Sequence, residues 1–223
     1  MNSVPILSCA ICEKRKEKRF CPAVHGRICP QCCGEQREVT LDCPSDCTYL
    51  LQAREHEKPR PFEQLDQESL FPKIEIADQF LYEQEQLILG LSYSLARSAR
   101  SAHDIRDADL ISASTTLAKS YETLASSGLH YEIPVASLTH QAIASELQKT
   151  IKEYREAERK HLGFTKLRDS DVLRGLVFLL RMALTRTSGR PRSRAFVDFL
   201  FRQFPENEGA IAAGDEGSRI IVP

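Results

Sequence analysis

The chain has no tryptophan, and none of its eight cysteines lies after Cys47. It also lacks an apolar run of about 18 residues, the length that a membrane-spanning helix needs. The first eight residues have neither the basic start nor the apolar stretch of a secretory signal, so we expect the thiols to be in a reducing compartment. There, clustered cysteines bind metal more often than they form disulfides. We therefore expect a cytoplasmic protein with no membrane partner.

The charge of the 223-residue chain is nearly balanced, with a formal net charge of −1. This balance argues against a generally basic surface that coats nucleic acid. The charge is uneven, however. Residues 61–160 carry 16 acidic and 10 basic side chains, a net of −6, and residues 165–204 carry 3 and 9, a net of +6. We expect these two regions to attract each other within the fold.

Four pairs of metal-ligating residues follow one another near the N-terminus. They are Cys9/Cys12, Cys21/His25, Cys29/Cys32 and Cys43/Cys47. Two ligands separated by two or three residues can hold one zinc ion from a single tight turn, and four ligands complete a tetrahedral site. Four pairs therefore predict two structural zinc ions.

The spacing of the pairs favours an interleaved arrangement, in which the first and third pairs bind one ion and the second and fourth pairs bind the other. The first site is then Cys9, Cys12, Cys29 and Cys32, and the second is Cys21, His25, Cys43 and Cys47. Only three residues separate the second pair from the third, which is short for two sequential sites. Sequential sites are the alternative, and Cys33 is an alternative ligand to Cys32 or to His25.

The metal has an energetic role, because residues 1–60 contain few large apolar side chains and cannot build a core alone. Structural zinc contributes on the order of 10 kcal/mol or more to the folding of such small modules. Protein ligands fill all four positions of each predicted site, which leaves no place for a catalytic water. We expect a structural metal rather than a hydrolytic one.

The stretch from Cys9 to Pro22 resembles the start of the HIT and MYND zinc-finger families. The shared features are a cysteine knuckle, a polar run and an aromatic residue, Phe20, directly before the third ligand. The resemblance covers residues 9–47 only, and Cys43/Cys47 stands where those families have a late His-x3-Cys. It implies cross-braced zinc and a protein-interaction module rather than a catalyst.

The cysteine-free remainder has apolar residues at steps of three and four, which predicts helices. The predicted helices lie at about 76–102, 110–127, 143–162, 171–187 and 196–204, with Gly128 as a C-cap and Gly163 after the third helix. The fourth is apolar almost all round, which is typical of a central, buried helix. The predicted organisation is a two-zinc module at 1–57, a Pro-containing linker at 58–72, an all-α bundle of about five helices at 73–205 and a flexible tail at 206–223.

No complete catalytic constellation is present, because His103-Asp104 and the Glu158/His161 pair both lack the further ligands that their sites would need. We expect no enzyme and identify no small-molecule substrate. The leading interpretation is a zinc-binding adaptor that binds a protein partner. The alternative is a nucleic-acid-binding regulator that uses basic residues of the module and of the 186–194 loop, namely Lys14, Arg15, Lys16, Arg190, Arg192 and Arg194. For the loop, helix capping is the preferred role.

Overall fold

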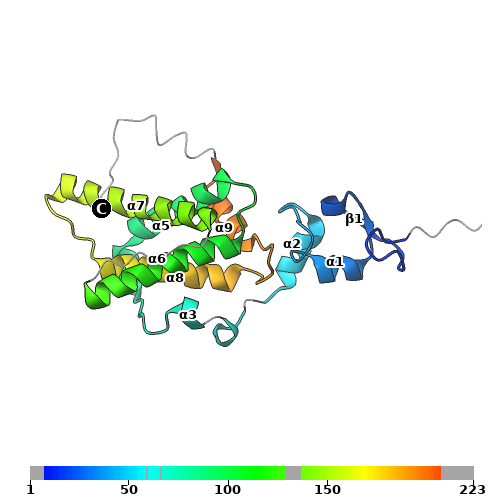
Figure 1. Ribbon diagram of the computed structural model, residues 1–223, viewed down its shortest axis with the longest axis horizontal. Helices are drawn as coiled ribbons and strands as arrows, with labels where there is room; N and C mark the ends of the chain where they lie inside the picture. Colours follow the sequence, from blue (N-terminus) through cyan, green and yellow to red (C-terminus); the bar gives the residue numbers. More distant parts are fainter. Residues whose placement is uncertain (1–7, 59, 66, 129–136, 207–223) are drawn as a thin grey trace, which may run out of the picture.

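The computed structural model describes residues 8–58, 60–65, 67–128 and 137–206. A small cysteine module (residues 8–56) lies at one end of the molecule, and a helical bundle forms most of the rest (Figure 1). The cysteine module contains β1 (Arg19–Cys21), the 3-10 helix η1 (Pro22–Val24), β2 (Gly26–Ile28), α1 (Pro30–Gln36) and α2 (Thr48–His56). A short connection follows with η2 (Phe62–Gln64) and α3 (Gln67–Leu70). The bundle contains α4 (Asp78–Glu83), α5 (Glu85–Ser101), α6 (Asp107–Ser127), α7 (Leu138–Leu162), α8 (Asp169–Arg186) and α9 (Ala195–Gln203).

The cysteine module is built around an antiparallel hairpin of β1 and β2. Cys21 pairs with Gly26 at the turn, and Arg19 pairs with Ile28 at the open end. Cys29 therefore leaves the hairpin at the end opposite Cys21, which favours the use of these two thiols in different ligand groups. The Cys9/Cys12 pair precedes this hairpin in the sequence and the Cys29/Cys32 pair follows it, so the folding of the hairpin brings the two pairs together.

Helix α8 is the centre of the bundle, as its sequence predicts. It contacts α3, α5, α6 and α9. Its buried side chains lie on several faces and include Val172, Leu176, Leu179 and Ala183. The surrounding helices contribute Leu91, Leu95, Leu110, Leu117, Leu147, Phe196 and Leu200 to the same core. This apolar packing, and not metal, holds the bundle together.

Two helix ends that the sequence predicts are confirmed, and one predicted helix is wrong. Gly128 (φ 69°) and Gly163 (φ 80°) end α6 and α7 in the left-handed conformation, as predicted. The predicted helix at 76–102 is instead two helices, because Gln84 (φ −112°, ψ 21°) leaves helical geometry between α4 and α5. The helix count of the described chain therefore exceeds five, since α1, α2 and α3 also lie outside the bundle.

The arginines of the basic region 165–204 bind backbone carbonyl groups in several places rather than the acidic side chains that we expected. Arg181 donates to the carbonyl oxygens of Leu70, Phe71 and Ile74 at 2.8–2.9 Å and so fastens the connection to α8. Residues 207–223 of the predicted tail lie outside the described residues. Within the described chain, no helix combines the length and the apolar character needed to cross a membrane.

Candidate metal centre

Four thiols from two distant knuckles meet in the cysteine module. The Sγ atoms of Cys9, Cys12, Cys29 and Cys32 all lie within 4.8 Å of one another. Cys9, Cys29 and Cys32 are buried and Cys12 is half-buried. These are the first and third pairs of the sequence, so their interleaving is confirmed for this group.

Local backbone geometry directs these sulfur atoms inward. Cys29 caps the N-terminus of α1, and its Sγ accepts a hydrogen bond from the backbone N–H of Cys32 at 3.4 Å. The N–H of Cys29 in turn donates to Cys9 Sγ at 3.1 Å. At the first knuckle, Glu13 (φ 55°) donates its N–H to the carbonyl oxygen of Cys9 and closes a tight turn. Such N–H···S bonds favour the thiolate form, which is the form that binds metal.

Arg15 adds a positive charge beside this group. Its Nη1 donates to Cys29 Sγ at 3.6 Å and to Cys32 Sγ at 3.7 Å. The N–H of Cys32 and the Arg15 guanidinium lower the pKa of Cys29 to about 6, against the opposing effect of burial. Burial and the neighbouring thiols raise the pKa of Cys32 to about 12. Thiolates at this spacing repel one another, and a divalent cation between them would offset that repulsion.

The chemistry of this donor set fits one metal ion. Four thiolates in a buried cluster suit a soft cation in tetrahedral geometry, and zinc in structural sites is bound in this way. The four ligands come from the protein, so the site has no open position for a substrate or a reactive water. The group can hold and stabilise a fold but offers no Lewis-acid site to a substrate.

The second predicted group is not gathered in the same way. Across the residues that the structure describes, no other set of three or more candidate ligands lies within 4.8 Å of one another. Cys21 is buried at the end of β1, and Cys43 and Cys47 are half-buried before α2. His25 is exposed and has a left-handed backbone (φ 48°).

Cys33 lies in surroundings that differ from those of His25. It is buried in α1 and shares an apolar cluster with Cys21, against which Cys43 packs. Arg19 Nη1 donates to Cys33 Sγ at 3.5 Å, much as Arg15 does in the first group. Burial raises the pKa of the Cys43 thiol, and the Cys47 and Cys21 thiols act in the same direction. Cys33 is therefore buried in a cluster that contains Cys21 together with Cys9, Cys29 and Cys32, whereas His25 is exposed.

Three of the six basic residues proposed for nucleic-acid contact donate hydrogen bonds within the protein, although Arg15 among them is exposed. Arg15 binds the thiols, Arg190 donates to the carbonyl oxygens of Gly34 and Arg37 at 3.1 and 2.7 Å, and Arg194 donates to the carbonyl oxygen of His103. The other three side chains, Lys14, Lys16 and Arg192, are exposed. The loop arginines thus join the bundle to the cysteine module and to the start of α6.

A buried polar network, which sequence reasoning did not predict, fastens the cysteine module to the bundle. Arg54 of α2 donates to Glu38 Oε1 at 2.8 Å and to Asp198 Oδ2 at 2.6 Å. Ser188 donates to the second oxygen of Glu38, and Ser45 donates to the second oxygen of Asp198. Glu38 and Asp198 are 160 positions apart in the chain, and no local pattern links them. The unusual burial of two carboxylates, Glu38 at 2% and Asp198 at 8% exposure, marks the site once the fold is known.

Comparison with known proteins yields no relative: no family model, no curated protein and no solved structure matches this chain. Membership of the HIT or MYND families is therefore not shown.

Proposed function

We propose that this chain is a zinc-dependent protein-interaction protein without catalytic activity, in which structural zinc folds the cysteine module and the helical bundle carries it. The observation that carries the proposal is the closed group of Cys9, Cys12, Cys29 and Cys32. A metal with four protein ligands stabilises a surface instead of activating a substrate.

The proposal includes a second zinc ion bound by Cys21, Cys43 and Cys47 with Cys33 as the fourth ligand. Cys33 is favoured over His25 because it is buried in the same cluster as Cys21 and its sulfur accepts a hydrogen bond from Arg19. Every cysteine of the chain then has a role. The sulfur atoms of this second group would move together when the ion binds, since metal binding and folding are coupled in small modules.

An interaction role is supported by apolar side chains that the module presents to solvent. Phe20 on β1 is 55% exposed, and Val24 at the adjoining turn is 38% exposed. β1 lies on the side of the module away from the bundle (Figure 1). Exposed aromatic residues on a rigid support are typical anchors of protein interfaces. The hairpin that bears them depends on the metal, so partner binding would depend on it too.

Metal content tests the chemical part of the proposal. Native mass spectrometry of the zinc-loaded chain should show two zinc ions, and X-ray absorption should show about four sulfur ligands per zinc near 2.3 Å. His25→Ala should keep both ions, whereas Cys33→Ser should lose one. Loss of one ion from His25→Ala but not from Cys33→Ser would assign the fourth position to the histidine. Absence of zinc, or disulfides among these cysteines, would refute the proposal.

Partner capture tests the interaction part. The zinc-loaded chain, the chelated chain and Phe20→Ser are compared as baits under equal conditions, with Leu138→Ser as the matched control. Leu138 is 85% exposed and lies on α7, far from the module in sequence. We expect a partner that is lost with chelation and with Phe20→Ser but kept by the control. A set of bound proteins that is identical for all four baits would contradict an interaction through this surface.

A further inference from the structure

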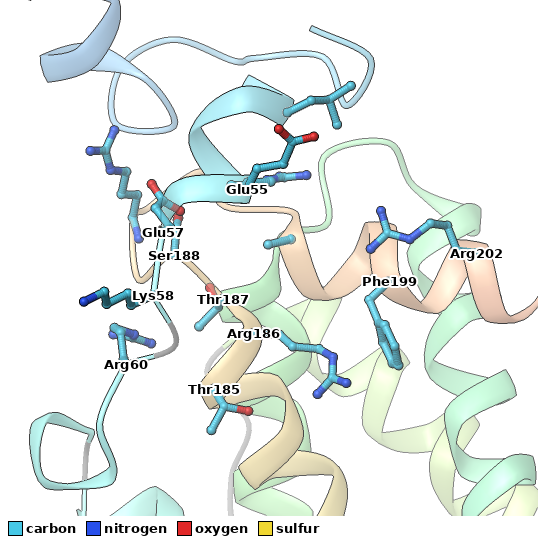
Figure 2. A pocket seen from close by; sticks show the side chains of 14 residues that line it. Glu55, Glu57, Lys58, Arg60, Thr185, Arg186, Thr187, Ser188, Phe199 and Arg202 are labelled. Carbon is cyan, nitrogen blue, oxygen red and sulfur yellow. Dashed lines mark hydrogen bonds between the residues drawn. The ribbon is translucent and has the colours of Figure 1, made fainter. Parts of the chain in front are cut away.

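A cleft lies where the cysteine module meets the bundle, and we call it the junction cleft. It is formed by the end of α2 with Glu57, Lys58 and Arg60, the end of α8 with the turn that follows, and one face of α9. In Figure 2, Lys58 and Arg60 lie on one side, Arg186, Phe199 and Arg202 lie on the other, and Thr185 and Thr187 lie between them. Its volume is about 710 Å³, within the range of small-molecule sites.

The lining of the junction cleft is strongly basic. Six cationic side chains border it: Arg54, Lys58, Arg60, Arg186, Arg190 and Arg202. Two acidic side chains, Glu55 and Glu57, also border it, which leaves a formal charge of +4. Only Arg54 among the six is ion-paired with a described residue, through Glu38 and Asp198. When Glu38 and Asp198 are counted with the lining, the six cations and four carboxylates give +2 in a chain whose net charge is −1.

Two of these unpaired cations are held in place by backbone oxygen atoms. Arg60 donates to the carbonyl oxygen of Leu184 at 3.1 Å, and its Nε is buried without a hydrogen-bond partner. Arg190 donates to the carbonyl oxygens of Gly34 and Arg37. Carbonyl groups fix a guanidinium but do not neutralise it. The fold therefore immobilises positive charge beside the cleft before any ligand arrives, which lowers the entropy lost on binding.

The turn after α8 is shaped around one of these arginines. Gly189 has a left-handed backbone (φ 74°), and a Cβ atom there would lie 2.5 Å from Arg60 Nη1. The positive φ favours glycine at this position, and a larger residue would also have to displace the Arg60 guanidinium. On the opposite wall, the Arg186 guanidinium stacks on the Phe199 ring at 4.1 Å, which orients a third cation.

We propose that the junction cleft binds a small ligand that carries two or more phosphate groups. Guanidinium groups match phosphate oxygens in geometry and charge, and five of the cations that line the cleft have no carboxylate partner among the described residues. Several separated cations suit a di- or triphosphate better than a single phosphate. Such a ligand would contact Lys58, Arg60 and α9 together and would strengthen the joint between the module and the bundle.

A small ligand fits this site better than a nucleic-acid strand. The cations lie around a concave cleft, whereas strand binding needs a basic groove that continues along the backbone of many nucleotides. The other basic run, at residues 14–19, leads into β1, on the side of the module away from the bundle (Figure 1). The two basic regions therefore do not form one track.

Calorimetric titration of the zinc-loaded, full-length chain with pyrophosphate and with ATP tests the proposal. The variants are Lys58→Gln and Arg202→Gln, both at exposed positions where the fold tolerates change. Arg159→Gln makes the same charge change at an exposed position on α7 and is the matched control. Circular dichroism confirms that each variant is folded.

We expect saturable 1:1 binding that weakens as salt rises, and an affinity about tenfold or more lower in each cleft variant but unchanged in the control. Tighter binding of ATP than of pyrophosphate would mean that the cleft also contacts the base and sugar, and equal binding would mean that it contacts phosphate alone. The proposal is wrong if millimolar ligand gives no binding heat, or if the cleft variants bind like the control. It is also wrong if single-stranded RNA binds with an affinity that rises with its length while both small ligands fail.

Discussion

Replacing Arg54 with methionine should detach the cysteine module from the bundle. The Arg54 side chain is 17% exposed and bridges two nearly buried carboxylates, Glu38 at 3% and Asp198 at 9% exposure. Methionine retains much of the packing volume but removes the charge. Both carboxylates would then stay in the joint without a cation, which is the costly way to break a buried ion pair.

The expected loss is about 3 kcal/mol of stability. Removal of one partner from a buried pair costs about 3–5 kcal/mol, and we take the lower end because Ser45 and Ser188 still donate to the carboxylates and some water can enter. Urea unfolding is followed with two probes: far-UV circular dichroism reports mainly on the bundle, and a chromogenic chelator reports zinc release from the module. We expect both transitions to move to lower urea, with the larger shift in zinc release.

The control is Lys152→Met, which removes an exposed charge paired with Glu156 at 3.9 Å on α7. It should change stability by no more than about 0.5 kcal/mol. Adding Glu38→Gln and Asp198→Asn to Arg54→Met should recover part of the loss, because no charge then remains buried. If Arg54→Met shifts the transitions no more than the control, the network does not hold the joint and the reasoning is refuted.

Three further results are expected. Cys29→Ser should lose one zinc ion per chain, measured by elemental analysis, and should keep most of its far-UV helix signal, because α5–α9 contain no cysteine. Loss of most of the helix signal would mean instead that the cysteine module and the bundle fold as one unit. Asp107→Ala should lower the free energy of unfolding in urea by about 2–4 kcal/mol, because Asp107 Oδ1 accepts hydrogen bonds from the N–H groups of Phe196 and Val197 and caps α9. Asp107→Asn keeps an acceptor oxygen and should therefore lower it clearly less. Burial raises the pKa of Asp107 above its unfolded value of about 3.9, so the folded state holds this proton more tightly. The free energy of unfolding of the wild type, relative to that of Asp107→Asn, should therefore fall as pH rises from about 3.9 through the raised folded pKa. Urea unfolding at several pH values measures this difference. A difference that rises with pH would mean that the fold favours the ionised carboxylate, against our expectation.

Local sequence signals predicted a good part of this fold. The Cys-x-x-Cys spacings indicated knuckles, and the short gap between the second and third pairs indicated interleaving. The first and third pairs do meet in the group of Cys9, Cys12, Cys29 and Cys32. Gly128 and Gly163 ended helices because only glycine adopts the left-handed conformation without strain. The apolar circumference of α8 indicated a central helix. Each of these signals acts between residues close in the chain or through composition alone.

Other features could not be predicted because long-range packing decides them. Cys33 and His25 are equally good zinc ligands in the sequence, and only the fold buries one among the cysteines and exposes the other. The break at Gln84 carries no proline or glycine, so the periodicity continued through it. Arg190 and Arg194 belong to one basic loop in the sequence, but in the fold each donates to a carbonyl group of a different distant segment.

The sequence by itself indicated a cysteine module with thiols that can hold a metal and a cysteine-free helical remainder, because ligand spacing and apolar periodicity are local properties. Tertiary structure alone decided how the two are joined. It placed Glu38, Arg54 and Asp198 in one buried network and arranged unpaired cations around the junction cleft. Charges interact through space, so the folded arrangement of the chain decides which charged side chains become partners, and their order in the sequence does not.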